Sequence, residues 1–134
     1  MGMMVATTTG TRTGLQQAGQ VVWLIDPEHW LRALLRAELI ERGYDAIGFT
    51  SMEDAIFRLA VERHRRPRLV LVNLSGQQVT PGAIALLGAG GVPVLGIGSA
   101  TEPAAGGLAL SAVLRRPMSL GQVADAIEQA LTPH

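Results

Sequence analysis

The side chains that could carry out chemistry follow apolar runs of the chain. Asp26 and Glu28, separated by Pro27, come directly after the run Val-Val-Trp-Leu-Ile at residues 21–25, and Asn73 lies within the run Leu-Val-Leu-Val-Asn-Leu. Carboxylate oxygens are the ligands that Mg²⁺ prefers, and a carboxylate can also accept a phosphoryl group as an anionic nucleophile. The uncharged amide of Asn73 is a poor nucleophile, so the pair Asp26 and Asn73 suggests binding more than catalysis.

The residue types that the sequence lacks exclude several reactions. There is no cysteine, and all 11 basic residues are arginine. Thiol catalysis, zinc–thiolate sites, Schiff-base chemistry and a phosphate-binding lysine are therefore excluded. The histidines at positions 29, 64 and 134 are too scattered for a metal site. We predict no catalytic residue, no metal and no cofactor, and we expect that the protein is not an enzyme.

Hydrophobic periodicity predicts five strands that alternate with five helices. The strands are expected at residues 21–25, 44–49, 69–74, 92–97 and 110–114, and the helices at 27–42, 51–64, 81–87, 101–108 and 119–131. The runs at 21–25 and 69–74 are apolar throughout, which is typical of strands buried on both faces of a parallel sheet. Right-handed crossovers leave few topologies. We predict an α/β fold, a flavodoxin-like (βα)5 three-layer sandwich with parallel strand order 2-1-3-4-5.

The helix that follows Asp26 carries an apolar face. Its leucines at positions 31, 34, 35 and 39 share one side at helical spacing, and Gly43 ends the helix. Two tryptophans flank Asp26. We assign Trp23 to the core, whereas Trp30, early in the helix, is a candidate for an exposed contact surface.

Length and charge limit the class of protein. The 134 residues, 48% of them hydrophobic, suit one globular domain, which we place at residues 21–132 after a flexible N-terminal tail at residues 1–20. The tail lacks the apolar segment of a signal peptide. The 11 acidic residues balance the 11 basic ones, so we expect no nucleic acid and no membrane as partner. The uncharged stretch 69–101 contains several glycines and prolines, and we interpret it as buried strands and a helix of a cytoplasmic protein.

These landmarks resemble those of response-regulator receiver domains over residues 21–131. Asp26 matches the first acid of the family's acidic pair, and Gly43 lies at the family's distance from it. Asn73 occupies the place of the phosphoacceptor aspartate, and Arg116-Pro117 takes the place of the Lys-Pro that follows strand 5. The resemblance implies the receiver fold and a role in two-component (phosphorelay) signal transduction.

The active residues of that family are mostly replaced. Pro27 stands where the second acid belongs, Glu28 is one residue late, and Gly98 takes the hydroxyl position, with Ser99 after it. These differences predict a degenerate phosphorylation pocket, formed by Asp26, Pro27, Glu28, Asn73, Gly98, Ser99, Arg116 and Pro117. Arginine is a planar fork and does not replace the lysine that clamps a phosphoryl group.

Three interpretations of single pocket residues stay open. In our hypothesis, Asp26 forms an ion pair with Arg116 that replaces a metal ion. Asp26 before Pro27 is also typical of a helix N-cap with proline at the first helical position. Asn73 could simply cap the loop after its strand, and Arg115 and Arg116 could be only a solvated pair.

The resemblance predicts a pseudo-receiver that acts by phosphorylation-independent protein–protein interaction. Its partner would be a signalling protein, either a histidine kinase or an effector domain, or a second copy, with a homodimer through helix 4, strand 5 and helix 5. The interface candidates on that face are Ala104, Ala105, Leu108, Val113 and Met118. The alternatives are a receiver with residual Mg-dependent phosphoryl switching, and a small-ligand sensor in a strand-end crevice that Gly96 and Gly98 would enlarge.

Overall fold

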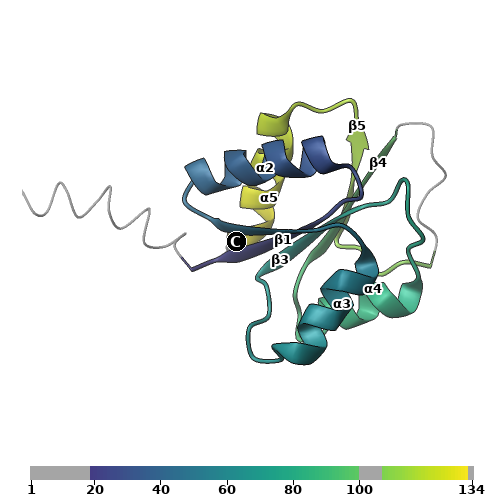
Figure 1. Ribbon diagram of the computed structural model, residues 1–134. Coiled ribbons are helices and arrows are strands. Elements are labelled where there is room, and N and C mark those ends of the chain that lie inside the picture. Colours follow the sequence, from purple (N-terminus) through teal and green to yellow (C-terminus); the bar gives the residue numbers. More distant parts are fainter. Residues whose placement is uncertain (1–18, 100–106, 133–134) are drawn as a thin grey trace, which may run out of the picture.

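Five parallel strands form the central sheet of the structure, a computed structural model that describes residues 19–99 and 107–132. The strands are β1 (Val21–Ile25), β2 (Asp45–Phe49), β3 (Leu69–Asn73), β4 (Val94–Ser99) and β5 (Ala112–Arg116). Their order in the sheet is β2-β1-β3-β4-β5, and every neighbouring pair is parallel. The predicted fold class and strand order are therefore confirmed (Figure 1).

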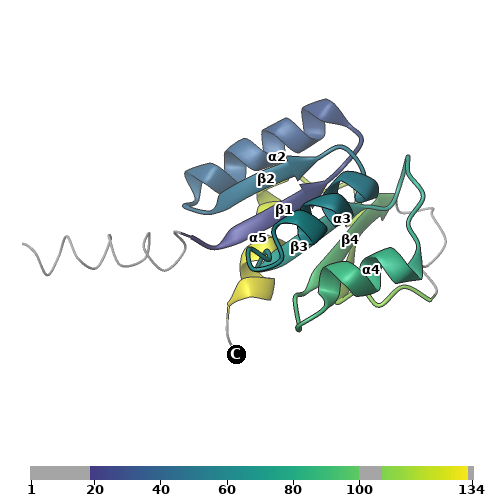
Figure 2. The same cartoon turned by 60° about the horizontal axis from the view of Figure 1, so that its bottom comes forward.

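Helices cover both faces of the sheet. The helices among the described residues are α2 (His29–Glu41), α3 (Met52–Val61), α4 (Pro81–Gly88) and α5 (Leu120–Leu131). α2 and α5 lie on one face, and α3 and α4 lie on the other, as the two views in Figures 1 and 2 show. Two of the helices begin where serine caps were predicted. The Ser51 side chain accepts a hydrogen bond from Asp54 N, and the Ser119 side chain accepts one from Gln122 N.

The two faces of the sheet bury two separate clusters of apolar side chains. Leu24, Leu71 and Leu39 belong to the cluster on the α2 and α5 side, whereas Trp23 and Val72 belong to the cluster on the α3 and α4 side. Side chains alternate between the faces along each strand, so a continuous apolar run supplies both clusters. Trp23 is only 2% exposed, as expected of a core residue.

Several element boundaries differ from the predicted ones. The first helix begins at His29 and not at Pro27, because the Asp26 side chain accepts from Glu28 N at 2.8 Å and holds a turn there. β4 starts two residues later than predicted, after Pro93, which has no N–H to donate to a neighbouring strand. β5 is also shifted by two residues, to Ala112–Arg116. The predicted helix at 101–108 lies outside the described residues except for Gly107 and Leu108, which are not helical.

The apolar face predicted for the first helix is only half correct. Leu35 and Leu39 are buried, but Leu31 and Leu34 are 40% and 49% exposed. The strands below α2 contact one narrow side of the helix, so a second apolar side of α2 faces outward. The predicted tail at residues 1–20 lies outside the described residues except for Gly19 and Gln20. None of the helices in the described ranges is long and apolar enough to cross a membrane.

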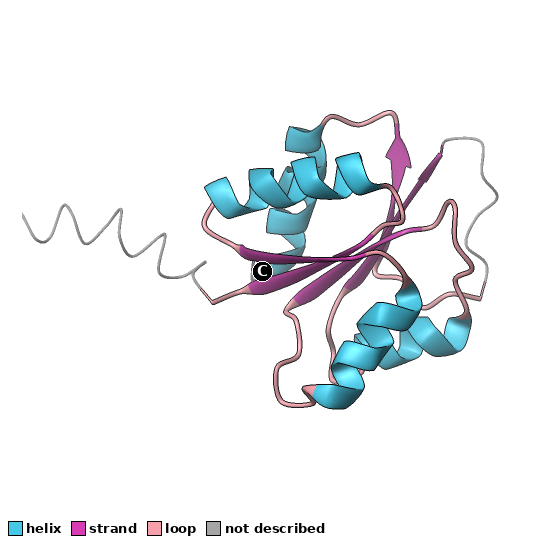
Figure 3. Ribbon diagram, viewed as in Figure 1, coloured by secondary structure: helices cyan, strands magenta, loops and turns pink. Residues whose placement is uncertain are grey.

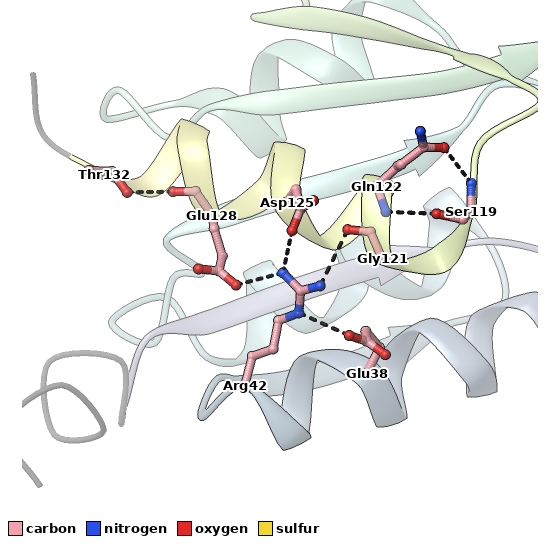
Figure 4. Close-up of polar contacts among 8 residues, drawn as sticks. All are labelled: Glu38, Arg42, Ser119, Gly121, Gln122, Asp125, Glu128 and Thr132. Carbon is pink, nitrogen blue, oxygen red and sulfur yellow. Dashed lines mark hydrogen bonds and ion pairs between the residues drawn. The ribbon is translucent and has the colours of Figure 1, made fainter. Parts of the chain in front are cut away.

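A cluster of charged side chains joins α2 to α5 (Figure 4). The Arg42 guanidinium donates to Glu38 at 3.0 Å, to Asp125 at 2.7 Å and to Glu128 at 2.7 Å. It also donates to the Gly121 carbonyl at 3.3 Å. Hydrogen bonds to Asp125, Glu128 and Glu38, in that order of effect, raise the pKa of Arg42 above its usual value. Arg42 therefore stays charged and links the ends of two helices that are far apart in sequence.

Candidate functional site

The predicted pocket residues gather at the carboxyl edge of the sheet, in the loops and strand ends coloured pink and magenta in Figure 3. Asp26 follows β1, Asn73 ends β3, Ser99 ends β4, and Arg116 ends β5 with Pro117 directly after it. The Arg116–Pro117 peptide bond is cis. In doubly wound sheets, ligands bind at this edge, beside the strands where the order reverses. The structure therefore places these residues at the edge of the sheet where the sequence analysis expected them, and their role as a site stays a prediction.

Asp26 and Asn73 are in direct contact. The Asn73 Nδ2 group donates a hydrogen bond to Asp26 Oδ1 at 2.9 Å, and the backbone N–H of Glu28 donates to the same oxygen at 2.8 Å. β1 and β3 are adjacent in the sheet, which places residues after their ends side by side. One carboxylate oxygen of Asp26 thus accepts from two neutral N–H groups that belong to the protein itself.

The rest of the Asn73 side chain is also hydrogen-bonded. Asn73 Oδ1 accepts from Ser75 N at 2.9 Å, which forms a turn and matches the predicted loop-capping role. Gln77 Nε2 donates to the Asn73 carbonyl at 2.7 Å. Asn73 is the buried polar residue of the described core, at 6% exposure, and these bonds satisfy its amide. The amide is held with its N–H toward Asp26 and its oxygen toward Ser75.

A positive charge lies on the other side of Asp26. Arg32, on the first turns of α2, donates from its guanidinium to the Asp26 carbonyl oxygen, and its second terminal nitrogen lies 3.2 Å from His29 Nδ1. Gly48 on β2 leaves the space for this side chain, because a Cβ atom at residue 48 would lie 2.9 Å from Arg32 Cδ. A glycine on an edge strand and an arginine on the helix above it together place a cation beside the strand-end turn.

The predicted ion pair between Asp26 and Arg116 is wrong. Among the ion pairs of the described residues, none joins these two side chains. The strand order explains this, since β3 and β4 lie between β1 and β5 and separate their backbones by about 14 Å. Arg116 is paired in register with Ser99, and the neighbouring Arg115 donates to the Ser99 carbonyl at 3.1 Å. The N-cap role of Asp26 is also wrong, because Glu28 occupies the N-cap position.

The interior of the strand-end site is filled. The hollow that Asp26, Arg32 and Asn73 line, together with the core residues below them, measures about 10 Å³. That volume is about the minimum for one water molecule. The space opposite Gly96, which we expected to enlarge the crevice, is occupied by Leu74 and Leu110, whose side chains would lie 2.9 and 3.0 Å from an added Cβ.

The residues at this edge do not fit a Mg²⁺ site. Mg²⁺ needs near-octahedral oxygen coordination that usually includes more than one carboxylate. Asp26 is the one carboxylate directed into the site, since Pro27 has no side-chain ligand and Glu28 is exposed. No group of three metal-binding side chains occurs within residues 19–99 and 107–132. The Arg32 guanidinium also brings positive charge close to the place where a cation would bind.

The predicted interface residues divide into two groups. Ala104 and Ala105 lie outside the described residues. Leu108 packs against the α3 and α4 core cluster, Met118 packs against the α2 and α5 cluster, and Val113 is partly buried in β5. Beside them, a groove of about 700 Å³ runs between the edge of the sheet and α5. Its apolar lining is supplied by Pro93, Leu95, Ala112, Leu114, Ala126 and Ala130.

Sequence reasoning missed the contacts of three residues that shape the site, of which Arg115 was considered only as part of a solvated pair. Arg32, Gln77 and Arg115 all donate to backbone carbonyls near the strand ends. Nothing in the spacing of Arg32 distinguishes it from other arginines of its helix. Only Gly48, an isolated glycine inside a predicted strand, gave a usable signal, because such a glycine often marks the close approach of another group.

The comparisons with known proteins identify the fold. No protein-family model matches this sequence, and no curated protein matches it. Solved structures do match. A response regulator receiver protein from Burkholderia phymatum is 21% identical, with a TM-score of 0.70 over 83% of this chain and 94% of that one. An orphan response regulator of H. pylori is 18% identical, with a TM-score of 0.70 over 87% and 99% of the two chains. A chemotaxis response regulator of Vibrio cholerae is 14% identical, with a TM-score of 0.68 over 83% and 98%.

Proposed function

We propose that this chain, which has the fold of response-regulator receiver domains, is a pseudo-receiver domain of a two-component signal transduction protein. It acts by phosphorylation-independent protein–protein interaction and not by catalysis. The proposal covers residues 21–132 and a cytoplasmic location. The observation that carries it is the hydrogen bond at 2.9 Å from Asn73 Nδ2 to Asp26 Oδ1, which lies at the position where the resemblance places a phosphoacceptor carboxylate.

The chemistry at Asn73 supports this proposal. Phosphoryl transfer to a side chain needs an anionic oxygen nucleophile with a free approach to the phosphorus atom. The Asn73 side chain is neutral, and its oxygen already accepts from Ser75 N at 2.9 Å. Its nitrogen donates to Asp26, and the lone pair of an amide nitrogen is delocalised into the carbonyl group, so it is not available for attack. Both atoms of the amide are therefore engaged in structural bonds.

The charges around Asp26 support the same proposal. Asp26 Oδ1 accepts from Glu28 N and Asn73 Nδ2, so a metal ion could bind this oxygen only in competition with two short hydrogen bonds. The Arg32 guanidinium beside the Asp26 carbonyl would repel a divalent cation. In this proposal the turn after β1 is stabilised by the protein's own hydrogen bonds and needs no metal ion. The domain would then bind its partner without a switch in conformation at this site.

The partner in this proposal is another signalling protein, a histidine kinase or an effector domain, or a second copy of the chain. The face formed by β5 and α5 remains a candidate contact surface through Val113 and Met118, whereas Leu108 packs on the opposite side of the sheet against the α3 and α4 cluster. The adjacent groove between β5 and α5, about 700 Å³ in volume, supports that candidate because its lining is mostly apolar.

An NMR titration of backbone amides tests the proposal. Mg²⁺ is added first, followed by beryllofluoride, which mimics a phosphoryl group. We expect no saturable shifts at residues 26, 73 and 116 in the natural chain. Saturable shifts at these residues would contradict the proposal and favour residual phosphoryl switching.

The matched variant for this titration is Asn73→Asp. It restores a carboxylate at residue 73, where the amide now faces Asp26. We expect this variant to respond to Mg²⁺ where the natural chain does not, since two neighbouring carboxylates attract a divalent cation. A separate titration with nucleotides and other small anions distinguishes a ligand sensor, because saturable shifts there would appear without Mg²⁺.

A further inference from the structure

The outward side of α2 carries an apolar stripe where a surface helix is usually polar. We name it the α2 stripe, and it consists of Trp30, Ala33, Leu34, Ala37 and Ile40. Measured from Trp30, the other members follow at intervals of 3, 4, 7 and 10 residues, so all five share one side of the helix. Trp30 is 70% exposed, Leu34 49% and Ile40 45%, and both alanines are exposed.

The inner side of α2 accounts for the packing of the helix on the sheet. Leu35 and Leu39 are buried there, and Arg36 donates to the Ala46 carbonyl of β2 at 2.8 Å. The flank toward α5 holds Glu38 and Arg42 in the charged cluster of Figure 4. The α2 stripe takes part in none of these contacts. Single exposed apolar residues are ordinary on a surface, but five on one helical side form a patch of the kind that marks an interface.

Four of the five residues in the α2 stripe are placed symmetrically about residue 35, and the fifth, Leu34, has the exposed Arg36 as its counterpart. Trp30 and Ile40 lie five positions on either side of it, and Ala33 and Ala37 lie two positions on either side. In an antiparallel pair of identical helices related by a two-fold axis, positions at equal distances from the centre face one another. Trp30 of each copy would then pack on Ile40 of the other, and the small alanines would meet at the centre, where the helix axes come closest.

The polar side chains at the two ends of α2 complement each other in the same register, because an imidazole N–H can donate to a carboxylate. His29 and Glu41 lie six positions on either side of residue 35, and both are exposed. Antiparallel pairing therefore places the His29 ring of one copy beside the Glu41 carboxylate of the other, twice per dimer. Glu41 is the one charged residue on the outward side of α2, so no like charges oppose one another along the pair.

From this symmetry we propose that a second copy of this chain covers the α2 stripe, in an antiparallel α2–α2 contact. This surface is separate from the face of β5 and α5, and it borders the strand-end site, because His29 Nδ1 lies 3.2 Å from Arg32 Nη2. The contact does not depend on whether residue 73 accepts a phosphoryl group, so it stands apart from the function proposed above. The helix is about 20 Å long, and a contact of that length is at the small end of specific interfaces.

Sedimentation velocity of the full chain at increasing concentration tests the proposal. A contact of this size predicts a dissociation constant on the order of 10 to 100 µM, so the dimer should grow over that range. Ala37→Glu places a charge at the centre of the contact and should weaken the dimer by at least about tenfold. Phe57→Glu is the matched control, because Phe57 is 71% exposed on α3, on the opposite face of the sheet.

The register is tested by cysteine cross-linking and by charge exchange. The chain has no cysteine, so Ala33→Cys and Ala37→Cys each introduce a single thiol. A mixture of the two variants should form the mixed disulfide faster than either variant forms a disulfide with itself. Glu41→Arg alone should weaken the dimer, and the double variant His29→Glu with Glu41→Arg should restore it. Circular dichroism verifies that α2 stays folded in each variant.

Three results would overturn the proposal. The first is a chain that stays monomeric up to about 1 mM, well above the expected dissociation constant. The second is a dimer that Ala37→Glu leaves intact but Ala130→Glu, in the groove beside α5, disrupts. The third is preferential disulfide formation between identical positions, which would exclude the antiparallel register.

Discussion

Two polar clusters of this molecule are built in opposite ways. At the strand ends, one carboxylate, that of Asp26, is satisfied by neutral N–H groups from Asn73 and Glu28. Between α2 and α5, one guanidinium, that of Arg42, is surrounded by three carboxylates. At the strand-end site, the groups that bind the Asp26 carboxylate carry no charge. The ion pairs of Arg42 lie instead between α2 and α5. The difference is that the Asp26 carboxylate is held by neutral N–H groups, whereas the three carboxylates around Arg42 are held by a cation.

The largest expected effect comes from removing the Arg42 charge. Arg42→Ala leaves three carboxylates close together and cuts the link between α2 and α5, so it should lower the free energy of unfolding by about 1–2 kcal/mol. The figure is reduced for solvent, because the Asp125 side chain is 67% exposed. Urea unfolding measures it. Arg63→Ala, at an exposed arginine after α3, is the control and should change stability by less than about 0.5 kcal/mol.

The same comparison has a pH dependence with a definite sign. The three carboxylates raise the pKa of Arg42 in the folded state, so the folded chain holds this proton more tightly than the unfolded chain does. A raised pKa contributes stability that is fully present below the unfolded value and is lost only at higher pH. The stability difference between the natural chain and Arg42→Ala should therefore be equal at pH 7 and pH 10. A difference that disappears by pH 10 would contradict the assignment.

A smaller effect is expected at the strand ends. Asp26→Ala removes the acceptor of Asn73 Nδ2 and leaves a buried amide without its partner, at a cost of about 1 kcal/mol. Asp26→Asn keeps an oxygen at that position and should cost less. Thermal unfolding of both variants and of Arg116→Ala shows whether Asp26 stabilises the fold through its hydrogen bond with Asn73 or through an ion pair with Arg116. A loss for Arg116→Ala equal to that for Asp26→Ala would revive the ion pair that the strand order excludes.

The smallest effect is expected at Gly48. In Gly48→Ala the new methyl group would lie 2.9 Å from Arg32 Cδ, the middle of a flexible side chain that can move aside. We expect a change in stability of no more than about 1 kcal/mol and a displacement of Arg32 from the Asp26 carbonyl. The amide chemical shifts of residues 26–28 report the displacement. Unchanged shifts would show that Arg32 does not depend on the space at Gly48.

The sequence was sufficient for the fold because its signals are local. Continuous apolar runs such as 69–73 mark buried parallel strands, and the capping boxes at Ser51 and Ser119 mark helix starts. The edge of the sheet that carries Asp26 and Asn73 followed from topology alone. What failed were statements about which side chains meet. The Asp26–Arg116 pair ignored the two strands that the predicted order already placed between β1 and β5.

The Arg42 cluster could not be predicted from the sequence, because its members are far apart along the chain. The carboxylates of Asp125 and Glu128 lie 83 and 86 positions along the chain from Arg42. No short motif can encode such a pairing. The outward side of α2 was missed in part because four leucines at helical spacing were assigned to one buried face, whereas the sheet covers only Leu35 and Leu39. Periodicity shows that a helix has an apolar side, but it does not show how wide a side the sheet will cover.

The long-range character of the Arg42 cluster has a kinetic consequence. Closing a loop of more than 80 residues costs chain entropy, so we expect the carboxylates of α5 to reach Arg42 late in folding, after β3, β4 and β5 have assembled. Contacts that form so late in folding are largely absent from the transition state. They therefore slow unfolding and leave the folding rate almost unchanged. In this chain the contacts of a single guanidinium, that of Arg42, are therefore expected to slow the separation of α5 from α2 during unfolding.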